Sequence, residues 1–205
     1  LKKTTREKGN FVPVDILSSH VAWKVAGNLR KITGTANVKF RVLKKGYPFL
    51  LLNPNSTVEF GGEAKTIQKL TSEEFNKSNY YAIMEIVEPN KEHEVVFNYS
   101  FDFDPNTTKH ILPLEYYSHK FVEMGIPANG LTDRFPLELK ISVSGEQDYK
   151  VFANAKVITL TSRVFRLKFP PYFNSMSFFI DLVNSNRVVT VNKAIKSIDG
   201  RHLKL

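Results

Sequence analysis

The feature that most constrains the fold is a strict alternation of side chains over residues 29–43. One set is apolar or small: Ile32, Gly34, Ala36, Val38, Phe40 and Val42. The other set is polar: Lys31, Thr33, Thr35, Asn37, Lys39 and Arg41. A period of two that lasts this long puts the sets on opposite faces of a β-strand, and it excludes an amphipathic helix. We therefore predict a strand with one face in the core and the other in water.

Further segments with strand patterns follow along the whole chain. They are residues 18–25, 49–52, 57–60, 65–70, 80–87, 93–104, 137–143, 149–153, 157–160, 162–169, 177–183 and 188–191. Helical periodicity is rare, and the 16 Phe and 8 Tyr suit packing between strands. We predict an all-β fold of large twisted antiparallel sheets, packed as a saddle or sandwich, with about 11 to 13 strands.

Two connections have the composition of hairpin turns. Ser144-Gly145-Glu146 separates the alternating residues 137–143 from the return at 149–153, which predicts a hairpin with one dry and one wet face. Gly61-Gly62 separates residues 57–60 from 65–70 in the same way.

The domain prediction is a flexible basic terminus, residues 1–10, followed by a single β-domain, residues 11–205. A soft boundary is expected near residues 106–109. Residues 197–205 form a turn and then the start of a strand without a partner, and the chain begins with Leu. The expectation is therefore a piece of a longer protein.

The net charge of +9 is concentrated in the first quarter of the chain. Residues 1–50 contain 11 Lys and Arg against 2 Asp and Glu, whereas the remaining residues contain 18 of each sign. A basic segment can bind nucleic-acid phosphates or an anionic membrane. The charges alternate with apolar residues as on an ordinary strand face, so we expect no nucleic-acid partner, and at most a peripheral membrane contact of the first 50 residues.

No residue pattern for catalysis or metal binding is found. The chain has no cysteine, and the nearest approach to a zinc motif is His93-Glu94-Val95-Val96-Phe97, in which Phe replaces the second His. On a strand, residues i and i+4 are about 13 Å apart, too far for one metal. Asp102 and Asp104, with Asn106, offer too few oxygens for calcium. We predict no catalytic residue, no metal site and no cofactor in this chain.

One loop segment contains a cluster of candidate interaction residues: Tyr116, Tyr117, His119 and Phe121. Aromatic side chains on a loop form either a recognition surface or a plug at the end of a sandwich, and both readings stay open. We expect no signal peptide, and the sequence contains no apolar run of about 20 residues, the length that spans a bilayer. The compartment is not predicted.

The order of these segments resembles the amino-terminal β-domain of M1-family zinc aminopeptidases. The segments with matching patterns are residues 34–40, 49–53, 95–100, 135–143, 151–155, 164–171, 177–181 and 197–205, which read GTANVKF, FLLLN, VVFNYS, FPLELKISV, VFANA, VFRLKFPP, SFFID and SIDGRHLKL. The sequence departs from the family where an aromatic-Pro or Pro-Cys-Phe-Asp-Glu-Pro signature is expected, because residues 116–119 and 125–133 occupy that place. The family's amine-binding Gln has no counterpart here.

The resemblance implies a non-catalytic domain that packs on a carboxy-terminal catalytic domain of the same polypeptide and helps to shape a cleft for peptide substrates. Zinc is then expected only in that following domain, and this chain alone is not expected to be an enzyme. The alternatives are a free-standing β-sandwich for binding or adhesion and, third, a basic binder of nucleic acid or membrane surfaces. The sequence does not predict the substrate, the oligomeric state or whether the parent protein is active.

Overall fold

The computed structural model describes residues 10–28, 31–51, 57–61, 67–70, 80–102, 134–172, 180–189, 194–196 and 202–204. These residues form an all-β fold, as the sequence predicts, with one short 3-10 helix at Ser185–Arg187. The strands are β1 Phe11–Val25, β2 Lys31–Val42, β3 Tyr47–Leu51, β4 Thr57–Gly61, β5 Ile67–Lys69, β6 Tyr80–Ile83, β7 His93–Asp102, β8 Leu137–Val143, β9 Tyr149–Ala153, β10 Lys156–Thr161, β11 Val164–Phe169, β12 Ile180–Asn184, β13 Ala194–Lys196 and β14 His202–Lys204.

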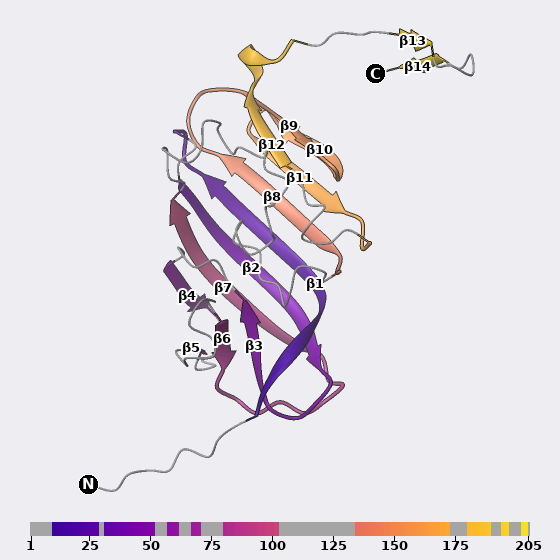
Figure 1. Cartoon of the computed structure of the whole chain (residues 1–205). Coiled ribbons are helices and arrows are strands. Elements are labelled where there is room, and N and C mark those ends of the chain that lie inside the picture. Colours follow the sequence, from indigo (N-terminus) through magenta and orange to yellow (C-terminus); the bar gives the residue numbers. More distant parts are fainter. Residues whose placement is uncertain are drawn as a thin grey trace, which may run out of the picture.

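A large sheet organises the molecule, with the strand order β10-β11-β8-β1-β2-β7-β4 (Figure 1). Strands β3, β6 and β5 branch from it, because the first residues of β1 pair with β3. The pairings of β1 with β3 and with β8 are parallel, while the other pairings are antiparallel. Parallel neighbours are joined by a crossover connection and not by a tight turn. Here β8 begins more than 100 residues after the end of β1.

Strand β1 contains a β-bulge that decides which side chains it buries. Its register against β2 shifts between Ile16 and Ser18. Before the shift the buried residues have even numbers, and after it they have odd numbers: Val12, Val14 and Ile16, then Ser19, Val21, Trp23 and Val25. A one-residue shift in a strand would turn all the following side chains to the opposite face. The bulge takes up the extra residue, so the apolar side chains on both sides of it point into the core. The bulge lies between the residues of β1 that pair with β3, 11–13, and those that pair with β8, 19–25.

One continuous hydrophobic core joins the large sheet to the smaller elements. It contains the inward residues of β1, β2, β8 and β11, together with Leu50 and Ile83 from the branch and Tyr149, Ile180 and Leu182 from the two-stranded sheet of β12 and β9. Phe135, just before β8, is also buried. The predicted dry face of residues 29–43 is confirmed, since every even residue of β2 is buried.

Three predicted strand arrangements are wrong. Strands β8 and β9 do not form a hairpin: β8 pairs with β1 and β11, and β9 pairs with β12. Strands β4 and β5 also pair elsewhere, with β7 and β6, so Gly61-Gly62 does not turn a hairpin. The final strand, β14, has a partner in β13. In the first two cases the partner strand is chosen by packing elsewhere in the chain, whereas β14 pairs with its neighbour in the sequence.

Candidate interaction surface

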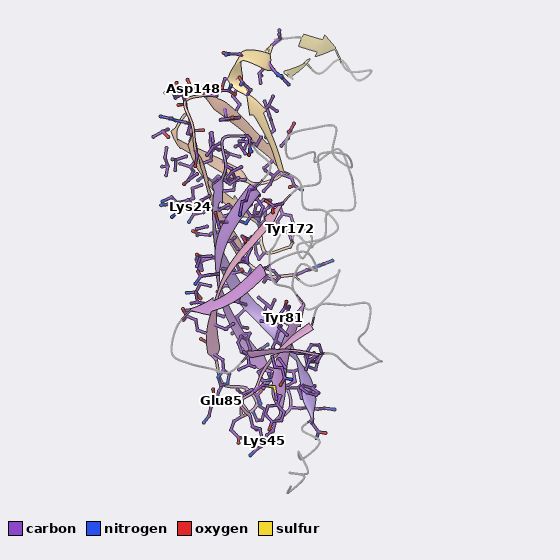
Figure 2. The ribbon with its side chains drawn as sticks, turned by 90° about the vertical axis from the view of Figure 1, so that its left-hand side faces the viewer. Lys24, Lys45, Tyr81, Glu85, Asp148 and Tyr172 are labelled. Atoms are coloured by element: carbon purple, nitrogen blue, oxygen red, sulfur yellow. The ribbon has the colours of Figure 1, made fainter. Side chains whose placement is uncertain are left out.

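The outward face of the large sheet is polar and forms lateral rows across neighbouring strands. Figure 2 shows the sheet nearly edge-on, with Lys24 on this face and with Tyr81 and Tyr172 on the opposite side. One row crosses five strands, from β11 to β7: Arg166, Lys140, Ala22, Thr35 and Asn98. The next row contains Ser142, Lys24, Thr33 and Ser100. Both rows point outward because their members alternate with buried residues on every strand.

A hollow of about 390 Å³ opens over β1, β2 and β7 on this face. It is lined by Ala22, Lys24, Thr33, Gly34, Thr35, Asn98, Tyr99 and Ser100. Most of its lining side chains are short, and Thr35 Oγ1 donates a hydrogen bond to Asn98 Oδ1 at 2.9 Å. Hydroxyl groups and an amide both donate and accept hydrogen bonds, so the hollow suits a ligand that is itself rich in hydroxyl groups.

Beneath the hollow, a hydrogen-bonded pair of aromatic side chains fixes the three strands from the inside. Trp23 Nε1 donates to the Tyr99 hydroxyl at 2.9 Å, and both residues are buried. Gly34 lies between them in register, and a Cβ added there would be 2.4 Å from Tyr99 Cζ. The missing side chain therefore lets the Tyr99 ring cross over β2 to reach Trp23. Burial raises the pKa of Tyr99 far above its ordinary value, so the phenol stays neutral.

The outward face is basic on one side of the hollow. Over β10, β11, β8 and the second half of β1 the cations are Lys156, Arg166, Lys168, Lys140 and Lys24, and all five are exposed. Among the described residues, the same part of the face carries one carboxylate, that of Glu138 on β8. On β2 and β7, by contrast, the basic side chains have acidic neighbours: Lys31 lies opposite Asp102, Lys39 lies opposite Glu94, and Arg41 pairs with Asp15 of β1.

Two pairs of cations in the basic part lie directly opposite each other on neighbouring strands. They are Arg166 with Lys140, and Lys156 with Lys168. Like charges in that position destabilise a sheet. Lys168 Nζ lies 2.8 Å from Glu138 Oε1, and His20 Nδ1 lies 4.0 Å from Glu138 Oε2. Hydrogen bonding from Lys168, with further attraction from Lys168, His20 and Arg166, lowers the pKa of Glu138, although burial opposes this shift.

Comparisons with known proteins give a consistent match of fold. No protein-family model matches the chain, and no curated protein sequence matches it. Among solved structures, an M1 zinc metallopeptidase from Deinococcus radiodurans has a TM-score of 0.59 at 10% identity, over 87% of this chain and 43% of that chain. Its E323A mutant bound to a Tyr-Ser-Ala substrate has a TM-score of 0.60 at 12% identity, over 93% of this chain and 46% of that chain. Native yeast LTA4 hydrolase has a TM-score of 0.57 at 13% identity, over 82% of this chain and 28% of that chain.

The chain has the fold of the M1 amino-terminal β-domain. This confirms the resemblance seen in the order of the sequence segments. The chain spans less than half the length of each of these three solved structures. The match concerns fold, because identities of 10 to 13% do not transfer a substrate or an activity.

The site residues predicted from the sequence, Tyr116, Tyr117, His119 and Phe121, lie outside the described residues, as does the predicted boundary at 106–109. Residues 93–97, the segment that comes nearest to a zinc motif, lie within the described residues. His93 stacks on Phe40 with ring centroids 5.6 Å apart, and Glu94 accepts a hydrogen bond from Asn37. These contacts give both residues structural partners at the start of β7. Asp102, one of the three residues that offer too few oxygens for calcium, is exposed and lies opposite Lys31 at the end of β7.

The described residues contain no group of three or more His, Asp or Glu side chains that could hold a metal ion. Within the same residues, no helix is long and apolar enough to cross a membrane.

Sequence reasoning missed the hollow and the basic rows because both depend on which strands are neighbours. The alternation did identify the outward residues of β2, including Thr33 and Thr35. It could not place Lys140 beside Ala22, since these residues are far apart in the chain and meet through a parallel pairing.

Proposed function

We propose that this chain is the non-catalytic amino-terminal β-domain of an M1-like zinc metallopeptidase. In this role it packs on a catalytic domain of the same polypeptide and helps to shape the cleft that receives peptide substrates. The observation that carries the proposal is the unequal coverage of the match. The fold likeness extends over 82 to 93% of this chain but over 28 to 46% of the chains of the two metallopeptidase structures and the LTA4 hydrolase.

The chemistry of the described residues supports the non-catalytic role. Peptide hydrolysis by a zinc enzyme needs three protein ligands around the metal and a nearby general base. The described residues offer no such set. Zinc and the general base would therefore come from the catalytic domain, and this domain would contribute surface and rigidity.

An activity assay tests the first half of the proposal. The 205-residue chain is incubated with aminoacyl p-nitroanilides, with and without added zinc, beside an intact M1 peptidase as a positive control. We expect no release of p-nitroaniline above the buffer rate. Hydrolysis that depends on metal and co-purifies with this chain would contradict the non-catalytic role.

The coding sequence that follows the codon of Leu205 tests the second half. We expect an H-E-x-x-H motif on a helix within about 150 further residues, since that motif supplies two zinc ligands and the base. A stop codon at that position would contradict the proposal and favour the free-standing binding module.

A further inference from the structure

We propose that the outward face of the large sheet binds an acidic oligosaccharide, a chain of sugar rings that carries sulfate or carboxylate groups. The hollow over β1, β2 and β7 receives the hydroxyl-rich rings, and the cations on β8, β11 and β10 bind the acidic groups. This proposal does not rest on the peptidase role, because it is argued from residues on the wet face of the sheet and needs no metal.

The position of the cations supports an anionic ligand. Arg166 and Lys140 lie opposite each other, and Lys24 lies on the same face of the adjacent strand β1, two residues beyond Ala22, the partner of Lys140. These three side chains are exposed, and none is within ion-pair distance of a carboxylate in the described part of the chain. An arginine fork binds sulfate or carboxylate with two parallel hydrogen bonds, and an anion placed between Arg166 and Lys140 removes their mutual repulsion.

The hollow supports a carbohydrate rather than a simple anion. It continues the same lateral row, because Ala22 lies next to Lys140 on one side and next to Thr35 on the other. Its polar lining consists of Thr33, Thr35, Asn98, Ser100 and Lys24. From β11 to β7 the row crosses four strand spacings, roughly 19 Å. A ligand that uses both parts must therefore be an extended chain with neutral polar and acidic groups.

The same surface gives less support to other polyanions. Single-stranded nucleic acid is normally held by stacking of bases on aromatic side chains. The aromatic residues of this half of the sheet, Trp23, Phe165 and Phe169, are buried on the inner face. An anionic membrane or a DNA duplex would use the charges but has no need of the hollow. Filling the hollow therefore separates a glycan from those two alternatives.

The test measures binding of the 205-residue chain to heparin by titration calorimetry at low and physiological salt. Dextran serves as a neutral glycan, and duplex DNA and phosphatidylserine vesicles serve as other polyanions. We expect micromolar binding to heparin that weakens as salt rises, and no binding to dextran.

Three variants locate the site. Lys140→Glu/Arg166→Glu should weaken heparin binding at least about tenfold, because it reverses the two opposed cations. Ala22→Leu keeps every charge but places a larger side chain in the hollow, and it should weaken heparin binding about fivefold or more while leaving any DNA or vesicle binding unchanged. The control Lys39→Glu/Lys45→Glu makes the same change of net charge away from the site. Lys45 lies at the far end of the molecule from Lys24 (Figure 2), and this variant should bind nearly as the parent does.

The proposal is overturned by no heparin binding at low salt, or by equal losses in the two charge-reversal variants. It is also overturned if Ala22→Leu binds heparin as the parent does, since the ligand would then use charge alone. Thermal melts of each variant confirm that all compared proteins are folded.

Discussion

Replacement of Gly34 by alanine should destabilise the fold although the backbone there suits any residue. Among the described glycines, positive φ is found at Gly145 and not at Gly34. Without a clash, Gly→Ala in such a strand would stabilise the fold by about 0.4–1 kcal/mol through the unfolded state. The added methyl group would instead meet the Tyr99 ring at 2.4 Å.

The magnitude follows from what the ring must give up when it moves. Forcing an extra methyl group into a packed core costs about 1–3 kcal/mol. Displacing the ring also breaks the 2.9 Å hydrogen bond from Trp23 Nε1 to the Tyr99 hydroxyl. The buried donor and acceptor then lose their partners, which costs about 1–3 kcal/mol. We expect a loss of about 3 kcal/mol in the free energy of unfolding. For a chain of this size, that lowers Tm by about 6–12 °C.

Urea unfolding followed by circular dichroism measures the cost, and a double-mutant cycle assigns it to the ring. In a Tyr99→Ala background the obstacle is gone, so Gly34→Ala should become neutral or slightly stabilising. In a Tyr99→Phe background the ring remains, so the substitution should stay costly. The reasoning would be refuted if Gly34→Ala changed stability by less than about 0.5 kcal/mol, or by the same amount in all three backgrounds.

Three further outcomes are expected. Trp23→Phe removes the indole donor and should cost about 1–3 kcal/mol in urea unfolding followed by far-UV circular dichroism; no change would show that the Tyr99 hydroxyl does not need this donor. Deletion of Leu17 removes the extra residue of the bulge and should prevent cooperative unfolding, because either half of β1 must turn its apolar side chains outward; a normal melt would contradict the register. The lowered pKa of Glu138 adds stability that is present above the unfolded pKa and is lost as pH falls through the folded pKa. Glu138→Gln should therefore lower stability near neutral pH by less than about 1 kcal/mol and converge with the parent in acid, whereas a constant difference from pH 7 to pH 3 would exclude this origin.

The fold class could be read from the sequence because the period of a strand is a local property. Residues 31–42 alternate without interruption, and each even position is buried as predicted. The strand segments predicted at 157–160 and 162–169 are found as β10 and β11, which pair antiparallel across a short turn at Ser162-Arg163 because they are neighbours in the chain. In both cases the information lies within a few residues.

The predictions that failed depend on contacts between distant segments. The first half of β1 was missed because its apolar residues change from even to odd positions at the bulge, which breaks the pattern expected of one strand. The supposed hairpin of 137–143 with 149–153 failed because Leu139 packs beside Val21 and Leu167, whereas Val151 pairs with Leu182. A turn can be recognised from its own residues, but these partners cannot.

The same distinction explains why the candidate surface differs from the charge distribution along the sequence. Counted by sequence, the excess positive charge belongs to residues 1–50. In the folded sheet, several cations of that segment face acidic partners, as Arg41 faces Asp15 at 2.8 Å and Lys45 faces Glu88 at 2.6 Å. Lys140 and Arg166, from the electrically balanced remainder of the chain, become opposed neighbours through the pairing of β8 with β11. The strand register that closes the core thus also sets which charges meet on the outer face, and this is why a binding surface arises where the sequence shows no charge excess.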